Sequence, residues 1–146
     1  VMADAPSRTA LHCLVAVARH HGLDLSAERL AHDHALGEGE VPLARLLRIA
    51  REAGLRARHV RLDWEDLPGL GGAFPVLAPL GNGNWVVLAG VQGTGPEAAA
   101  VVFDPLSGSA GLLLVPREQF LARWQGELVL LKRLGRPTDG LDTGLR

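Results

Sequence analysis

The stretch over residues 9–22 constrains the fold most, because it predicts a helix that is apolar nearly all the way round its first turns. A helix without a polar stripe is normally buried on several sides, so the rest of the chain is expected to pack around it. Ser7 or Thr9 is placed to cap its start. Two histidines and Gly22 follow, and glycine adopts the left-handed conformation that ends many helices.

The composition describes one domain of ordinary size. The chain has 146 residues, 47% of them apolar, which is enough for a sizeable core, and a net charge of −1 argues against nucleic acid as a partner. Cys13 is the only cysteine, so neither an internal disulfide nor a cysteine-based zinc site is expected. Neither a secretory signal nor a run of about 20 apolar residues is present, which indicates a domain of cytosolic character.

Two more helices and then a set of strands are expected. Ser26 is the expected cap of a short helix over 27–32, and leucine and alanine at helical spacing predict an amphipathic helix over 42–53. Asn82 and Gly83 predict a type I′ hairpin turn. The order predicts an α+β fold, with three N-terminal helices packed on an antiparallel sheet. The expected strands cover 55–58 (with a bulge near residue 59), 74–78, 85–91, 99–105, 111–115 and 127–133, and a short helix covers 117–124.

Five short strings occur in an order that is typical of one family. They are Cys13-Leu14 with residues 18–26, Phe74-Pro75-Val76-Leu77, Trp85-Val86-Val87-Leu88, Phe103-Asp104-Pro105 with Gly108, and Phe120, Trp124 and Gly126. Together they resemble the C39 peptidase domain at the N-terminus of bacteriocin and type I secretion ABC transporters. The resemblance implies a papain-like cysteine peptidase fold over residues 1–134, and 135–146 is interpreted as a linker towards a transmembrane domain.

The resemblance also places the family's catalytic groups on this chain. The nucleophilic cysteine falls on Thr9, the oxyanion glutamine on Ala3 and the histidine on Asn84, while the aspartate is retained as Asp104. Threonine forms no thiolate, and an asparagine amide cannot accept a proton as a general base. Loss of the nucleophile or the base costs about 10⁶-fold in a well-studied protease. A degenerate domain is therefore expected, in which Asp104 stabilises the turn before Pro105.

Within the family, degenerate domains of this kind imply binding without cleavage. The expected partners are an unfolded RTX-type protein awaiting export and the remainder of a bacterial ABC transporter, on the cytoplasmic side of the inner membrane. No cofactor, metal or nucleic acid is expected. A structural role in transporter assembly and an active leader peptidase are the alternatives. The expected substrate-binding residues are Thr9, His20, His21, Asn84 and Trp85.

Structural interpretations compete with several functional ones. Cys13 lies one turn inside the helix and is expected in the core, although an active peptidase would need it as the nucleophile. Trp85 is expected in the core, on the strand face opposite to Asn84. His32 and His34 form a His-x-His pair, for which a solvated helix end is favoured over a metal site. A solvated face, in preference to a site for acidic substrate segments, is expected of Arg51, Arg56, Arg58 and Arg61.

Overall fold

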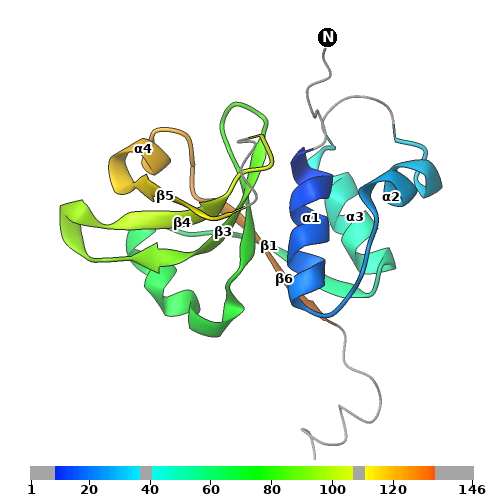
Figure 1. Cartoon of the computed structure of the whole chain (residues 1–146), viewed down its shortest axis with the longest axis horizontal. Coiled ribbons are helices and arrows are strands. Elements are labelled where there is room, and N and C mark those ends of the chain that lie inside the picture. The colour runs from blue at the N-terminus through cyan, green and yellow to red at the C-terminus, as the bar shows by residue number, and fades with distance from the viewer. Residues whose placement is uncertain (1–8, 37–40, 107–110, 134–146) are drawn as a thin grey trace, which may run out of the picture.

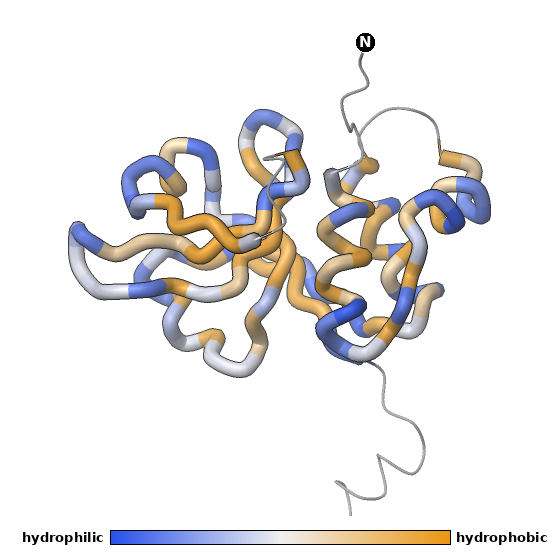
Figure 2. The backbone as a smooth tube through the Cα atoms, viewed as in Figure 1, coloured by the Kyte–Doolittle hydropathy of each residue, from blue (hydrophilic) through white to orange (hydrophobic). Residues whose placement is uncertain are grey.

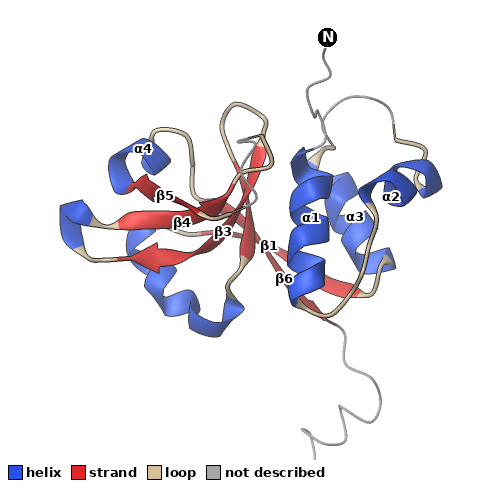
Figure 3. Cartoon of the chain, in the orientation of Figure 1, coloured by secondary structure: helices blue, strands red, loops and turns tan. Residues whose placement is uncertain are grey.

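The computed structural model describes residues 9–36, 41–106 and 111–133, with a helical layer on one side and a sheet on the other (Figures 1 and 3). The helices are α1 (Thr9–His20), α2 (Ala27–Asp33) and α3 (Leu43–Glu52). None of the described helices is both long and apolar enough to cross a bilayer.

Two of the predicted helix signals are confirmed. Ser26 caps α2, because its Oγ accepts a hydrogen bond from the backbone N–H of Arg29 at 3.2 Å. Gly22 has φ +84°, and the N–H of Leu23 donates to the carbonyl of Ala18 at 2.8 Å, which is the bonding of a glycine-ended helix.

The sheet is antiparallel throughout and has the strand order β1-β6-β2-β3-β4-β5. The last strand in the sequence, β6, lies between β1 and β2, so the C-terminal segment joins the two halves of the molecule. The strands are β1 (Leu55–Arg61), β2 (Val76–Pro79), β3 (Trp85–Gln92), β4 (Ala99–Phe103), β5 (Leu113–Pro116) and β6 (Glu127–Arg133). The shorter segments are η1 (Trp64–Ala73), η2 (Gly95–Glu97) and α4 (Arg117–Leu121).

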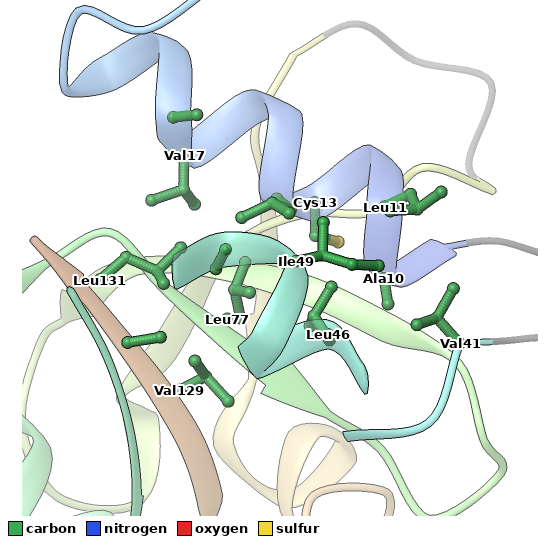
Figure 4. Packing of buried hydrophobic residues seen from close by; sticks show 14 of the residues in the cluster. Ala10, Leu11, Cys13, Val17, Val41, Leu46, Ile49, Leu77, Val129 and Leu131 are labelled. Atoms are coloured by element: carbon green, nitrogen blue, oxygen red, sulfur yellow. The ribbon is translucent and has the colours of Figure 1, made fainter. Parts of the chain in front are cut away.

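The core divides into two clusters, one on each face of the sheet. Consecutive residues of a strand point to opposite faces, so on β3 Trp85 and Val87 join one cluster while Val86 and Leu88 join the other. The first cluster lies under the helices, where α1 packs on β3 and β2 and α3 packs on β1. Leu77 of β2 and Val129 of β6 lie beneath them (Figure 4). The second cluster includes residues of η1 and α4, and apolar residues concentrate along the strands between the two (Figure 2).

Two local predictions are wrong. Among the described non-glycine residues only Ala35 has a positive φ, so Asn82 does not form a type I′ turn. Instead, the N–H of Gly83 donates to the carbonyl of Leu80 and the N–H of Leu80 to the carbonyl of Asn84, which closes a three-residue loop with Gly83 at φ +93°.

The bulge expected near His59 is also absent from the described register. All seven residues of β1 pair in register with β6. The burial pattern changes because β1 passes from one cluster to the other. Ala57 packs under the helices, whereas Val60 packs on the opposite face.

Candidate functional site

Thr9 lies at the positive end of α1 and binds the first residue of β3. Its Oγ1 accepts a hydrogen bond from the backbone N–H of Trp85 at 2.8 Å, across 76 positions of sequence. Thr9 is fully buried and Trp85 is 4% exposed. The hydrogen bond therefore fixes the start of the helix against the start of the strand, and the expectation that Trp85 belongs to the core is confirmed.

Asn84 precedes Trp85 and belongs to the hairpin loop. Its backbone N–H donates to Oδ1 of Asn82 at 3.0 Å, and its carbonyl accepts from the N–H of Leu80 at 2.8 Å. The residue is half-buried. Thr9 therefore binds the residue that follows Asn84, so the two positions lie near each other at the start of β3.

Asp104 follows β4 at the same end of the sheet, since Phe103 pairs with Val87 near the start of β3. Its Oδ1 accepts a hydrogen bond from the N–H of Leu106 at 2.9 Å, which is an Asx turn. This bond confirms the expected role at the turn. Asp104 also lines a cavity of about 440 Å³ together with Val86 and Val102, on the sheet face opposite to α1. Ala3 lies outside the described residues.

His20 and His21 lie at the other end of α1. The helix has 12 residues, so its ends are about 16 Å apart at about 1.5 Å per residue. The five expected substrate-binding residues therefore form two separate groups, with Thr9, Asn84 and Trp85 at one end and the two histidines at the other.

The two histidine rings meet edge to face, with their centroids 5.2 Å apart. Burial lowers the pKa of His21, and the neighbouring His20 lowers it further, while a hydrogen bond to the backbone of Leu131 acts in the opposite direction. Within the described structure, Nε2 of His21 is buried and has no hydrogen-bond partner. The pKa of His21 therefore lies below the ordinary value for histidine, which favours the neutral imidazole beside β6.

Cys13 and the His-x-His pair have structural surroundings. Cys13 is fully buried and lies among Ala10, Leu11 and Ile49 (Figure 4), so its expected place in the core is confirmed. His34 follows α2 as its C-cap, with Nδ1 3.8 Å from Oε1 of Glu52. No group of three or more potential metal ligands occurs among the described residues.

The arginines expected to share one solvated face have different roles. Arg51 donates from Nη2 to the carbonyl of Ala57 at 3.0 Å, and Arg61 pairs with Glu127 at 3.2 Å. Arg56 and Arg58, two members of the predicted basic group, instead line a cavity with Lys132 and Arg133, which the sequence did not place with them. Lys132 and Arg133 join them because β6 pairs with β1, a contact without a local sequence signal.

The helices packed on an antiparallel sheet, with α1 directed at the start of β3, form a papain-like cysteine peptidase fold. A model of the Peptidase C39 family matches residues 4–134, and the chain therefore belongs to the peptidase C39 family.

The chain is also similar to individual proteins in sequence and in structure. The chain is 33% identical over 131 residues to the cyclolysin secretion/processing ATP-binding protein CyaB of Bordetella pertussis, covering 90% of this chain and 17% of that protein. It is similar to the N-terminal peptidase C39-like domain of the toxin secretion ATP-binding protein from Vibrio parahaemolyticus, with a TM-score of 0.73 and 28% identity over 91% of this chain and 99% of that one. A double-glycine-motif protease from an AMS/PCAT transporter, solved with a leader peptide, shares the fold at a TM-score of 0.73 and 23% identity, over 91% of this chain and 89% of that one.

Proposed function

We propose that this chain is a non-catalytic C39 domain of a type I secretion ABC transporter, which docks an unfolded RTX-type protein on the cytoplasmic side of the inner membrane before export. The single observation that carries the proposal is the buried hydrogen bond between Thr9 and Trp85. A hydroxyl at the start of α1 serves there as a structural acceptor, at the position where the family resemblance implies a thiol nucleophile.

The chemistry of the neighbouring groups supports the loss of cleavage. A cysteine peptidase needs a thiolate, and an imidazole base beside the thiol to produce it. Thr9 is fully buried and its hydroxyl is engaged with a backbone N–H, while Asn84 carries an amide that does not accept a proton. Asp104 is engaged with the N–H of Leu106. Thr9 and Asp104 thus have structural partners, and neither Thr9 nor Asn84 supplies the thiol or the imidazole that the reaction needs.

An unfolded substrate fits the sheet face beside the helices. Leu114 on β5 pairs with Val101, which lies on the same face as Phe103 and the part of β3 that α1 covers. Leu112 and Leu114 are 61% and 60% exposed, so this face remains apolar and open beyond α1. β5 is also the last strand of the sheet, where an extended chain can add main-chain hydrogen bonds with little demand on its sequence.

Titration of the isotopically labelled domain with a calcium-free, unfolded RTX protein tests the proposal. We expect saturable chemical-shift changes along β5 and an intact partner afterwards. Leu114→Asp should weaken binding, because it places a charge in the apolar face, whereas Leu121→Asp on α4 is the matched control and should bind as the parent does. Absence of shift changes at about millimolar partner, where even weak complexes form, would refute docking. Cleavage of a double-glycine leader peptide would refute the non-catalytic assignment.

A further inference from the structure

A cationic cavity lies beside His21, at the opposite end of α1 from Thr9. It has a volume of about 620 Å³, which is within the range of small-ligand sites. Four exposed cations line it, and its lining includes no aspartate or glutamate among the described residues. The four are Arg56 and Arg58 on β1 and Lys132 and Arg133 on β6, and they are called the basic cluster below.

The basic cluster is a local feature of a chain whose net charge is −1. Arg56 and Lys132 are direct partners in the antiparallel register, and like charges opposite each other destabilise a pair of strands. Within the described structure, the ion pairs involve other residues than these four. The cluster therefore lowers the stability of the isolated domain, and an anionic partner would offset that cost.

The lining of the cavity indicates that an anionic ligand would also need apolar parts. Leu130, Ala73 and the largely buried Leu131 are the apolar side chains in its lining. Arg133 is held in place by a hydrogen bond from its Nη1 to the carbonyl of His21 at 3.3 Å. Because β1 and β6 are paired over seven residues, the backbone positions from which the cationic side chains extend are fixed relative to one another.

We infer that the basic cluster binds an acidic segment of polypeptide in which carboxylates alternate with apolar side chains. The carboxylates pair with the guanidinium groups, and the apolar side chain between them packs on Leu130. This inference rests on the proposed function for the source of the peptide, the exported polypeptide itself, and it places a second contact at the opposite end of α1 from Thr9.

A peptide fits this site better than a membrane surface does. An anionic bilayer presents a broad plane of headgroups, which binds cations on a flat or protruding surface. The basic cluster instead surrounds a concave space with apolar walls, which accepts a narrow ligand that has both charged and apolar parts. Binding should weaken as the salt concentration rises, because the cations are exposed.

The test titrates the 146-residue domain with the synthetic peptide acetyl-Asp-Leu-Asp-Leu-Asp-amide. Binding is measured by calorimetry or NMR at low salt. We expect saturable binding, and no binding of the same peptide with asparagine in place of aspartate. Arg56→Gln combined with Lys132→Gln should weaken binding by about fivefold for each cation removed. Arg29→Gln combined with Arg48→Gln changes the charge equally at exposed positions outside the cavity and should leave binding unchanged.

Several other results would overturn the inference. Equal binding of the asparagine peptide, or equal loss in both double variants, would show that the basic cluster gives no specificity. Binding to phosphatidylserine vesicles without binding to the peptide would assign the surface to a membrane. If the domain fails to bind the acidic peptide but still binds the unfolded RTX protein through β5, the inference is wrong and the proposed function stands. Thermal unfolding of the Arg56→Gln and Lys132→Gln variant should show no loss of stability, which separates a binding defect from misfolding.

Discussion

Gly126 lies directly against the backbone of Leu62. A Cβ atom on Gly126 would lie 2.9 Å from the Leu62 carbonyl oxygen, and the N–H of Leu62 donates to the carbonyl of Gly126 at 2.8 Å. The contact joins the segment after β1 to the segment before β6, at the end of the longest strand pair in the sheet. Glycine is required here both for this approach and for its φ of +96°.

Gly126→Ala is therefore expected to lower the free energy of unfolding by about 2–4 kcal/mol, from left-handed strain together with a backbone clash. Gly83→Ala is the matched control. Gly83 has φ +93°, but a Cβ atom there would meet no described atom within 4 Å beyond its chain neighbours. Gly83→Ala should therefore lower the free energy of unfolding only by the left-handed strain, about 1–2 kcal/mol. Urea unfolding of both variants measures the difference, and equal losses would show that the contact with Leu62 has no effect.

Thr9→Val should destabilise the domain by about 1–3 kcal/mol, because it leaves the buried N–H of Trp85 without its acceptor. Valine keeps the shape of threonine, so the loss reports on the hydrogen bond and not on a cavity. Thr9→Ser keeps the acceptor and should lose less. Denaturant unfolding with tryptophan fluorescence compares the three proteins, and a Thr9→Val variant as stable as the parent would contradict the structural role of the hydroxyl.

Asp104→Asn should retain the stability of the parent, since an asparagine Oδ1 also accepts from the N–H of Leu106. Asp104→Ala removes the acceptor and should cost about 0.5–1.5 kcal/mol. Thermal melting distinguishes the two. If asparagine were as damaging as alanine, the negative charge of Asp104 would be important in its own right.

The stability of the domain should fall as the pH is lowered below 6.5, the ordinary pKa of histidine, because burial lowers the pKa of His21 in the folded state. Between the two pKa values, His21 is protonated in the unfolded chain but not in the folded one. The loss of stability therefore levels off below the pKa that His21 has in the folded protein. His21→Gln should remove this component. Urea unfolding across pH 5–8 follows it, with the exposed His32→Gln as control. The prediction fails if both variants keep the pH dependence of the parent.

The local elements were largely predictable because their signals lie within a few residues. The cap at Ser26 depends on an N–H three residues away, and Gly22 ends α1 through bonds that span one turn. The last strand begins at Glu127 and ends at Arg133 as expected, since a continuous apolar run over 128–131 lies between Gly126 and the charged pair at its end. The expected papain-like fold followed from several such strings in order, and the family match agrees with it.

The residues of the chain by themselves determined where the helices and strands form and which groups stand at Thr9, Asn84 and Asp104. The tertiary structure decided what those groups do. Thr9 becomes an acceptor for Trp85 because α1 packs against the start of a strand 76 positions away. The basic cluster forms because β6 returns beside β1 and sets Lys132 opposite Arg56. Neither contact has a local signal, since packing of distant segments, and not the propensity of a segment, brings such groups together.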